Sequence, residues 1–351
     1  MNAHHRNEYQ RAGNVVCENS VSREVSMKER YYLSSVGRLE RDSHTLYFVR
    51  DDKRTPLPVK KIYDIFAGEG VSVTIGVFDL LAENNIALHI FSYNGAYRGT
   101  FLPPRPILSG KCHIEQARAY LDEGARRDLA GRFVKGALEN MRLNLQRYCD
   151  ENCGSTRKLS RKVAQVDEPT TIPELMQLEG SVRELYYRCI DHCLPDDFSF
   201  PHRTRQPPED PANSAMSYLN ALVYASVVTE LYHTRLSQTI SFLHEPHERR
   251  YSLSLDIAEI FKPLLADRLL LSLTRQGQLK PTNFKSEGRA VLLTDDGKRV
   301  LRHAFDKRLS ETRKHPSIRR SISWRRWIRT ECYQVSKHVL GLETYRPTTV
   351  R

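Results

Sequence analysis

Short apolar runs, rich in β-branched and aromatic residues, follow one another closely between residues 31 and 102. Residues that favour turns separate them, among them Asp51-Asp52 and Asn94-Gly95. The segment VFDLLAENN at 77–85 is the one expected helix in this region. The pattern therefore predicts a small β-rich domain. Its strands are expected at residues 31–35, 45–49, 57–66, 71–75, 86–92 and 97–102.

After residue 102 the apolar positions take helical spacing. Proline removes backbone donors and biases the preceding residue away from helix, so Pro103-Pro104-Arg105-Pro106 predicts a domain boundary. Residues 114–148 carry Leu, Ala, Phe and Met at helical spacing without proline, which predicts one helix of about 35 residues. The polar residues 151–169 are expected to form a loop or linker, and 284–294 a short hairpin. Further helices are expected at about 172–193, 212–237, 252–275, 296–313 and 317–340.

These elements predict an α+β protein in which a small β-rich N-terminal domain, residues 31–108, precedes a larger mostly α-helical domain, residues 109–345. Residues 1–30 are polar and are expected to be a disordered extension, or an upstream start preceding Met27. No stretch approaches the ~18 apolar residues of a membrane span, and the first 30 residues lack the apolar block of a signal peptide. We therefore expect a cytoplasmic protein.

The composition adds an excess of positive charge. The 351 residues include 54 Lys or Arg and 42 Asp or Glu, which gives a formal charge of +12 and suggests a polyanionic partner. Because 40% of the residues are hydrophobic, the chain can build a core, and collagen, coiled-coil rods and wholly disordered chains are excluded. The seven cysteines do not form a small secreted disulfide framework, so we expect free thiols.

Most of the positive charge lies in residues 298–329, where twelve basic residues face only Asp306 and Glu311. Trp324 and Trp327 lie among the arginines, a mixture able to grip phosphates and to pack on bases or on protein. The alternative is a solvated helix face with two core tryptophans. The residues singled out for DNA binding are Arg319, Arg320, Arg325, Arg326 and Arg329.

Candidate metal chemistry lies in SFLHEPHERRYSLSLDIAEIFKP, residues 241–263. Asp256 and Glu259 are three residues apart, so a helix beginning near Ser252 places them on one face. His244 precedes this helix in a loop that can fold back over it, as does His247. Two acids and a histidine suit Mg²⁺ or Mn²⁺ better than zinc, because carboxylates dominate and no cysteine is near. The alternative is an acid pair stabilised by the helix dipole, with a histidine that caps it.

Two further segments carry candidate residues. Glu179 is followed by Gly180, whose helix-interior position hints at close approach of a backbone or ligand, although a solvated glutamate is the alternative. In the Pro-rich segment that begins at Arg205, Asn213 is a plausible helix cap and Ser217 lies one turn later. Cys149, Cys153, Cys189, His192 and Cys193 allow a zinc site on paper, but buried thiols are the simpler interpretation.

Three of these segments, LEGSVRELYY, RQPPEDPANSAMSYLNALVY and SFLHEPHERRYSLSLDIAEIFKP, occur in this order after a β-rich domain. In this arrangement the chain resembles the CRISPR-associated integrase and endonuclease family, the larger of the two universal CRISPR adaptation proteins. YYLSSVGRLERDSHTLYF at 31–48 is similar to the opening strands of the family, and residues 70–101 are similar to its later β-domain. The resemblance covers residues 31 to about 340.

The resemblance implies a catalytic metal site. Glu179 matches the metal-binding glutamate of the family, His244 its histidine and Glu259 the second acid of its acid-x-x-acid pair. Asp256 matches the first acid and is expected to support the site, with Arg205, Asn213 and Ser217 bordering it, whereas His247 is expected to be structural. The sequence departs from many members by Ser241 in place of Gly and by Lys262 in place of Arg.

The implied activity is a metal-dependent DNA endonuclease and integrase, with Mg²⁺ or Mn²⁺ as cofactor, that inserts new spacers into a CRISPR array. The implied partners are spacer and repeat DNA, a second copy of the chain paired through the β-rich domain, and the small second CRISPR adaptation protein. Two other interpretations remain open: a non-catalytic DNA-binding scaffold, and an unrelated metal-dependent RNA nuclease.

Overall fold

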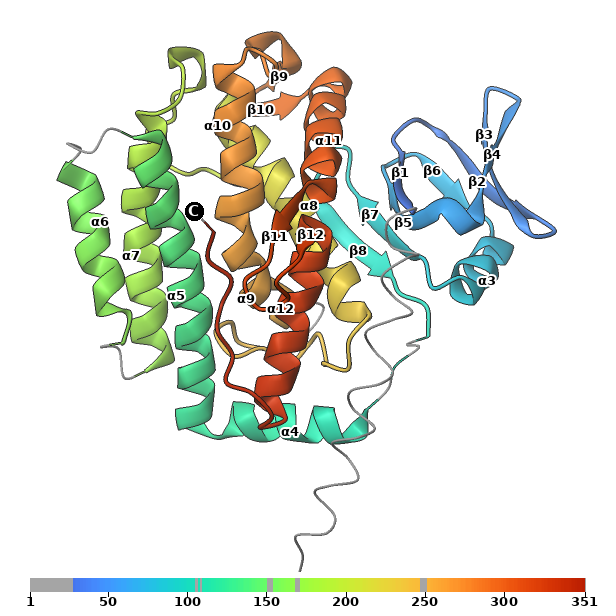
Figure 1. The fold of residues 1–351 in the computed structure, drawn as a ribbon. Helices are drawn as coiled ribbons and strands as arrows, with labels where there is room; N and C mark the ends of the chain where they lie inside the picture. Colours follow the sequence, from blue (N-terminus) through green and yellow to red (C-terminus); the bar gives the residue numbers. More distant parts are fainter. Residues whose placement is uncertain are drawn as a thin grey trace, which may run out of the picture. The chain divides into compact units, whose positions relative to one another are not determined.

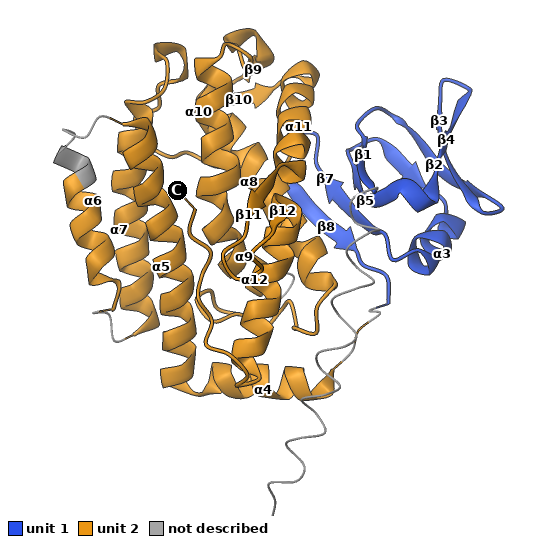
Figure 2. Ribbon diagram, in the orientation of Figure 1, with its two compact units in different colours: residues 1–93, 97–104 blue, residues 94–96, 105–351 orange. Residues whose placement is uncertain are grey.

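A computed structural model describes residues 28–104, 107, 109–149, 154–167, 171–246 and 251–350. The chain divides into two compact units (Figure 2). The first ends at Pro104, and the second contains the chain after it together with Asn94–Ala96. The first unit is β-rich and the second is mostly helical, so the expected α+β class is confirmed.

The β-rich unit contains two four-stranded sheets (Figure 1). In the order β1-β5-β7-β8, the first three strands are parallel and β8 is antiparallel to β7. In the order β4-β3-β2-β6, only the β2–β6 pair is parallel. A helix, α3 (Ile75–Glu83), follows β6. The strands are β1 (Glu29–Leu33), β2 (Gly37–Asp42), β3 (Thr45–Arg50), β4 (Lys53–Leu57), β5 (Ile62–Ala67), β6 (Val71–Val73), β7 (Ala87–Phe91) and β8 (Tyr97–Phe101).

Apolar side chains from both sheets and from α3 form the core of this unit, including Leu39, Ile65 and Leu81. The same unit also buries an ion pair between Arg30 and Asp64. The register of β1 with β5 sets Arg30 opposite Asp64, and two hydrogen bonds of 2.7 Å join the guanidinium to the carboxylate. His89 on β7 is also fully buried, and its Nδ1 lies 2.7 Å from Thr100 Oγ1.

The helical unit is organised around α8 (Pro211–Tyr232), which is buried along most of its length and packs on α9 and α12. On another side α5 packs against α6, α7 and α9. Among the described residues, every helix is too short or too polar to cross a lipid bilayer. The other helices are α4 (Gly110–Leu121), α5 (Glu123–Tyr148), α6 (Gly154–Ala164), α7 (Ile172–Asp191), α9 (Ser252–Phe261), α10 (Arg268–Arg275), α11 (Asp295–Ser310) and α12 (Trp324–Val339).

Two predictions for the first helices of this unit are wrong. The single helix expected from Ile114 to Tyr148 is two helices, because Asp122 leaves the helical conformation and caps α5 by accepting a hydrogen bond from the Ala125 N–H. The loop expected at 151–169 contains α6. Leu159 and Val163, one turn apart on α6, are both buried, and this short apolar stripe docks the helix against α5 and α7.

Other boundaries also differ. The expected strand at 57–66 is divided into the end of β4, a short 3₁₀ turn and β5, and β2 was not among the expected strands. The helix expected from residue 317 begins at Trp324, because β12 (Ser321–Ser323) first pairs with β11 (Thr312–Lys314). The hairpin expected at 284–294 is present as β9 (Phe284–Glu287) and β10 (Ala290–Leu293).

The expectation of free thiols is wrong for one pair of cysteines. A disulfide joins Cys149, at the end of α5, to Cys193, just after α7, because these packed helices bring their ends together. Neither sulfur is then available as a zinc ligand, and Cys153 lies outside the described residues. The remaining described cysteines, Cys112, Cys189 and Cys332, are buried and lie outside this disulfide.

The end of the chain is part of the helical core. Glu331 on α12 accepts hydrogen bonds from the backbone N–H of Thr348 at 3.1 Å and from its hydroxyl at 2.5 Å, and another from Tyr345. Asn140 on α5 binds the carbonyl of Thr348 at 2.9 Å and the N–H of Val350 at 3.0 Å. The segment after α12 is therefore fixed by buried polar side chains of two helices.

We predict that His89 makes the β-rich unit less stable in acid. Burial lowers the pKa of His89 from 6.5 to about 3, whereas the unfolded chain binds a proton near pH 6.5. Between these values the unfolded state holds more protons, so the free energy of unfolding should fall as pH falls, by roughly 1 kcal/mol per pH unit. Denaturant titrations of this unit's unfolding from pH 7 to pH 4 would measure the slope.

His89→Gln should flatten this slope relative to the parent protein, whatever its effect on stability at pH 7. The control is His44→Gln, since His44 is an exposed histidine in the turn between β2 and β3. An unchanged slope in His89→Gln would contradict the prediction.

Candidate active site

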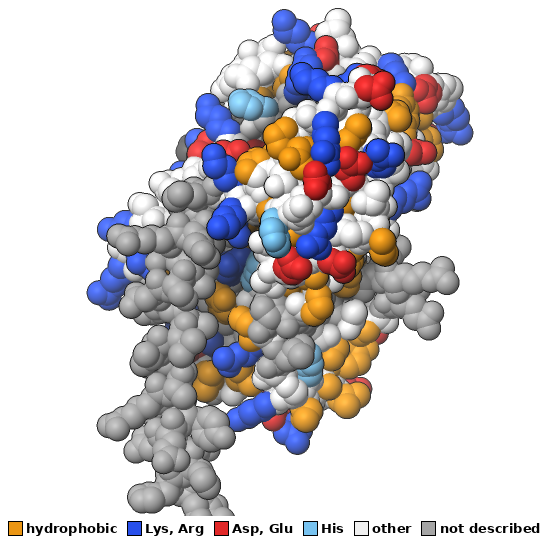
Figure 3. All heavy atoms as spheres, turned by 90° about the vertical axis from the view of Figure 1, so that its right-hand side faces the viewer, with side chains coloured by type: hydrophobic (Ala, Val, Ile, Leu, Met, Phe, Trp, Pro, Cys, Tyr) orange, Lys and Arg blue, Asp and Glu red, His pale blue; other side chains and the backbone are white. Residues whose placement is uncertain are grey.

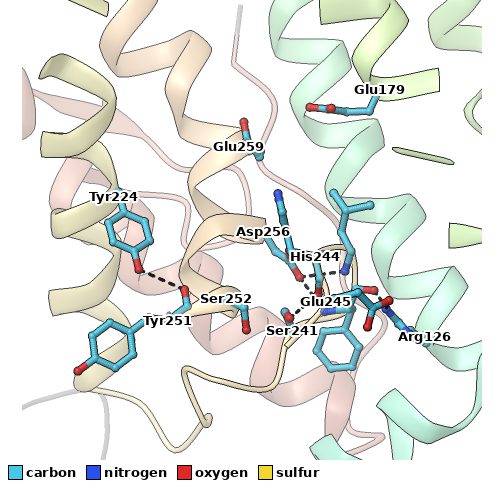
Figure 4. Close-up of polar contacts among 12 residues, drawn as sticks. Arg126, Glu179, Tyr224, Ser241, His244, Glu245, Tyr251, Ser252, Asp256 and Glu259 are labelled. Atoms are coloured by element: carbon cyan, nitrogen blue, oxygen red, sulfur yellow. Dashed lines mark hydrogen bonds and ion pairs between the residues drawn. The ribbon is translucent and has the colours of Figure 1, made fainter. Parts of the chain in front are cut away.

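The helical unit contains a cavity of about 580 Å³. Its wall includes Glu179 from α7, His244 from the loop before α9 and Glu259 from α9. These three residues are distant in sequence, and the fold brings them to one cavity (Figure 4). Arg183, Arg203 and Arg205 also line it, so acidic and basic side chains share the same wall.

Local sequence explains the position of the two helices. Thr171 and Glu174 form a capping box that starts α7, with Pro173 in its first turn, where a missing N–H costs nothing. Pro263 does not stop the helical run. After α9 ends at Phe261, a six-residue π-helical segment, Lys262–Asp267, continues the chain directly into α10. Glu259 therefore lies one turn before an irregular segment, on a helix whose side chains are nearly all buried.

Asp256 holds the histidine loop. Its carboxylate is fully buried and accepts the backbone N–H groups of Phe242, Leu243 and His244 at 2.7, 3.1 and 3.1 Å. It also lies 2.7 Å from His244 Nδ1 (Figure 4). This contact places the Nδ1 proton toward Asp256 and leaves Nε2 without a hydrogen-bond partner in the described part of the chain.

The imidazole of His244 is electrostatically biased toward its charged form. Burial disfavours the imidazolium, but the hydrogen bond to Asp256 and its charge outweigh burial and raise the pKa of His244. Asp256 and Glu259 do not form the carboxylate pair that their spacing suggested. Asp256 faces the loop at 242–244, whereas Glu259 faces α7.

Glu259 is paired with two cations. Arg183 donates to Glu259 Oε2 at 2.6 Å, and Lys262 donates to Oε1 at 2.5 Å. Burial would raise the pKa of Glu259, but the charges of Arg183 and Lys262 outweigh it and hold the pKa well below its ordinary value. The same Arg183 nitrogen also donates to Glu179 Oε1. One guanidinium nitrogen therefore joins the two carboxylates that the sequence singled out.

The three candidate ligands are not already arranged as a coordination shell. Within the described residues, no three His, Cys, Asp or Glu side chains are placed to hold a metal ion. Because both carboxylates contact one nitrogen, their oxygens lie within two hydrogen-bond lengths of each other. The position between them is occupied by Arg183, a residue that sequence reasoning missed, although the i, i+4 spacing from Glu179 indicates such an ion pair.

The segment before α8 also differs from expectation. Asp210 caps α8 in place of Asn213, because its carboxylate accepts the Asn213 N–H at 2.7 Å. Asn213 and Ser217 instead bind Arg203, at 2.8 Å to Oδ1 and 2.9 Å to Oγ. These two side chains therefore fix an arginine at the cavity wall, and Arg205 lies exposed at the same wall.

The basic segment at 298–329 is only partly available to a polyanion. Trp324 and Trp327 are buried, and their tilted rings lie 5.5 Å apart between centroids, so they pack on protein. Arg325 and Arg329 are buried too, and Arg329 donates to Glu230 at 2.6 Å, so neither side chain lies at the surface, where a phosphate would bind. Of the five arginines singled out for DNA binding, Arg319 and Arg320 are exposed and Arg326 is half-buried.

Basic side chains also occur elsewhere on the surface. On the face drawn in Figure 3, Lys and Arg lie interspersed with acidic and hydrophobic side chains. Some basic residues of the segment pair with acids on their own helix: Lys298 with Asp295 at 3.6 Å, and Arg299 with Asp296 at 2.7 Å. The local net charge is therefore smaller than the count of basic residues suggests.

Comparisons with known proteins agree with the resemblance seen in the sequence. The family model described as CRISPR associated protein Cas1 matches residues 31–307. CRISPR-associated protein Cas1 1 of Methanobrevibacter ruminantium is 40% identical over 323 residues, which are 92% of this chain and 99% of the relative. CRISPR-associated endonuclease Cas1 of Pyrococcus horikoshii is 40% identical over 320 residues, 91% and 98% of the two chains.

Solved structures show the same fold. A CAS1 protein from Thermotoga maritima superposes with a TM-score of 0.83 at 32% identity, covering 91% of this chain and 100% of that one. A casposase bound to integration product has a TM-score of 0.81 at 19% identity, covering 91% and 92%. A Cas6-RT-Cas1–Cas2 complex has the same score at 18% identity, covering 93% of this chain and 36% of that one. The last two similarities concern the fold alone.

We predict that Arg329 stabilises the fold. Arg329→Ala would remove the ion pair that Arg329 makes with Glu230, a carboxylate that is 1% exposed. Removal of one member of a buried pair costs roughly 3–5 kcal/mol, and the free energy of unfolding from urea titrations should fall by about that amount. The exposed Arg320 provides the control, and Arg320→Ala should change stability by less than about 0.5 kcal/mol. Equal, small losses for both variants would contradict this assignment.

Proposed function

The chain belongs to the Cas1 family of CRISPR-associated proteins, and from this premise we propose that it is a divalent-metal-dependent DNA integrase and endonuclease. Its proposed reaction inserts new spacers into a CRISPR array by attack of a DNA 3′-hydroxyl on a phosphodiester of the repeat. The relatives named as endonucleases support the nuclease activity, and the metal and the reaction are our inference from the site.

The observation that carries the proposal is the convergence of Glu179, His244 and Glu259 on one cavity. Two carboxylates and a neutral imidazole nitrogen are a donor set that Mg²⁺ and especially Mn²⁺ accept. The pairing with Arg183 and Lys262 favours ionised Glu259, and the imidazole presents Nε2. The residues present therefore fit a divalent cation held by Glu179, His244 and Glu259.

Supporting residues prepare the ligands. Asp256 fixes the tautomer of His244, because its carboxylate accepts the Nδ1 proton, and such partners of metal-binding histidines orient the ring and raise its basicity. Ser241 donates to the His244 carbonyl at 2.5 Å and so fixes the same loop. A bound Mg²⁺ or Mn²⁺ would supply polarisation of a phosphodiester oxygen and neutralisation of developing charge.

The arginines of the cavity suit the DNA backbone. Arg203 is held by Asn213 and Ser217, which gives it a fixed position, and Arg205 is exposed beside it. A planar guanidinium can bind two phosphate oxygens at once, so we assign Arg203 and Arg205 to the scissile strand. Alignment of this kind supplies a large share of the rate when a reaction joins two bound strands.

The proposed reaction needs no external energy. The 3′-hydroxyl oxygen of the incoming DNA forms a bond to phosphorus, the bond to the leaving oxygen breaks, and one proton passes from the attacking oxygen to the leaving one. The number of phosphodiester bonds is unchanged. Water in place of the 3′-hydroxyl gives hydrolysis, which accounts for nuclease and integrase activities at one site.

We also propose that the β-rich unit mediates a homodimer and that the dimer assembles with the small second adaptation protein. This unit exposes large apolar side chains, including Ile75 at 84% and Val36 at 76%, which a partner copy would cover. One similar solved structure is a complex that contains Cas2, which supports the second partner.

The test of the proposed metal site is Glu179→Gln, which keeps the side-chain shape but removes a carboxylate ligand. Loss of a residue that only supports a metal ligand costs about 10–100-fold, so loss of the ligand should lower the strand-transfer rate at least about 100-fold. The assay uses branched DNA that carries a repeat sequence, with Mn²⁺ or Mg²⁺. Glu115→Gln, on α4 and outside the cavity lining, should remain near the parent rate.

Full activity of Glu179→Gln would discredit the proposed ligand. Absence of strand transfer in the parent protein, with retained DNA binding, would favour the non-catalytic scaffold. Faster cleavage of RNA than of DNA of the same sequence would favour an RNA nuclease.

A separate prediction concerns DNA binding by the basic segment at 298–329. Arg319→Ala combined with Arg320→Ala should weaken binding to unrelated DNA sequences by similar factors, because phosphates carry no sequence information. Each lost phosphate contact should reduce the slope of log affinity against log salt by about 0.9 on duplex DNA. Fluorescence anisotropy at several salt concentrations would measure it. Arg289→Ala, an exposed arginine outside this segment, should leave the slope unchanged, and an unchanged slope in the double variant would place DNA elsewhere.

A further inference from the structure

Arg183 has an unusual position among the buried arginines of this protein. Its guanidinium lies between Glu179 and Glu259, the two carboxylates proposed as metal ligands, and its residue is 9% exposed. The hydrogen bonds to both acids come from a single nitrogen. The rest of the guanidinium has no partner among the described residues, and the side chain lines the cavity.

Other buried arginines are anchored differently. Arg30 binds one carboxylate through two nitrogens, at 2.7 Å each. Arg268 binds the Asn144 side chain at 2.6 Å and the Val350 carbonyl at 2.7 Å. These arginines bridge fixed groups through two atoms and cannot leave without breaking the core. Arg183 instead depends on two acids for its position, so a stronger cation that binds those acids would release it.

The geometry between the acids suits such an exchange. The carboxylate oxygens of Glu179 and Glu259 that contact Arg183 lie within two hydrogen-bond lengths of each other. Two oxygens bound to one Mg²⁺ or Mn²⁺ lie roughly 3–4 Å apart, so a modest inward movement would let one ion bind both. His244 lines the same cavity, and its Nε2 would be a third ligand for the ion.

The charges of the cavity also favour an exchange between Arg183 and a metal ion. Glu259 already has Lys262 on its other oxygen, so Arg183 and Lys262 together compensate the two carboxylates in the absence of metal. A divalent ion added to this arrangement would place two further positive charges beside Arg183. Like charges at such distances repel strongly in a partly desolvated site, so the ion and the guanidinium cannot both occupy the position between the acids.

We propose that Arg183 is an internal counter-cation that occupies the metal position in the metal-free protein and exchanges with the divalent ion. The inference rests on the proposed metal site and adds a residue that regulates its loading. Arg183 preserves the fold of the empty site by pairing two acids, and in doing so it lowers the affinity for metal. Metal binding is therefore coupled to the release of a guanidinium into the cavity where DNA is proposed to lie.

The test measures metal binding rather than activity. Arg183→Gln removes the competing charge, so Mn²⁺ should bind about tenfold more tightly by isothermal titration calorimetry, if Arg183 holds the site for about 90% of the time. In EDTA the melting temperature of Arg183→Gln should fall by several degrees, because the acids lose a partner, and saturating Mn²⁺ should restore most of the loss. The metal-induced rise in melting temperature should therefore exceed that of the parent protein.

The chain offers a matched control. Arg118 lies on α4, outside the cavity lining, and pairs with Glu115 at i, i+3 spacing in an exposed position. Arg118→Gln should leave both the Mn²⁺ affinity and the metal-induced rise in melting temperature as in the parent protein. Arg183→Lys keeps the charge but has a shorter reach and no fork, so its Mn²⁺ affinity should lie between those of the parent and Arg183→Gln.

The outcomes separate this inference from the proposed function. If the parent protein binds no Mn²⁺ at millimolar concentration, the metal site itself is wrong. If the parent binds Mn²⁺ and Arg183→Gln binds it equally or more weakly, the metal site stands and the exchange is wrong. If Arg183→Gln folds only when purified with Mn²⁺, the exchange is supported, and Arg183→Lys then supplies the affinity comparison.

Discussion

The helical unit is built around buried carboxylates, each of which needs a partner because an isolated buried charge is strongly unfavourable. Glu331 binds the end of the chain, and Glu230 pairs with Arg329. Asp256 gathers three backbone N–H groups and an imidazole, while Glu259 takes two cations. In each case the requirement for a partner joins segments that are distant in sequence. The same constraint that stabilises the core therefore also positions the residues of the cavity.

The two acids of the acid-x-x-acid motif, Asp256 and Glu259, find their partners in different ways. They lie three residues apart on α9, yet Asp256 is fully buried and Glu259 reaches the cavity wall. A carboxylate that accepts three backbone N–H groups is fixed in place, and Asp256 also holds the imidazole of His244. Among the described residues, the side-chain partners of the Glu259 carboxylate are the ends of Arg183 and Lys262. The acid with the fewer fixed partners is therefore the one that lines the cavity.

Sequence patterns predicted the parts of the fold that depend on local preferences. The β-rich and helical halves, α7, and the hairpin at 284–294 follow from apolar spacing and turn residues. The break at Asp122 was missed because the apolar spacing continues through it and only the side-chain cap interrupts the helix. The sequence motifs singled out Glu179, His244 and Glu259, and the fold brings all three to one cavity. Arg203 was not, since its contacts with Asn213 and Ser217 depend on how the preceding loop folds.

The basic segment shows why charge density alone is a weak guide to a binding surface. Arg325 and Arg329 lie on the same helix as the half-buried Arg326, and the sequence gives them equal weight. Which of them faces solvent is decided by Trp324 and Trp327, whose burial turns that side of α12 inward. Arg329 then needs an acid, and α8 supplies Glu230 about a hundred residues away. Buried arginines such as Arg329 therefore compensate buried acids, whereas arginines such as Arg320 stay exposed to solvent, and burial of the neighbouring aromatic residues decides between the two positions.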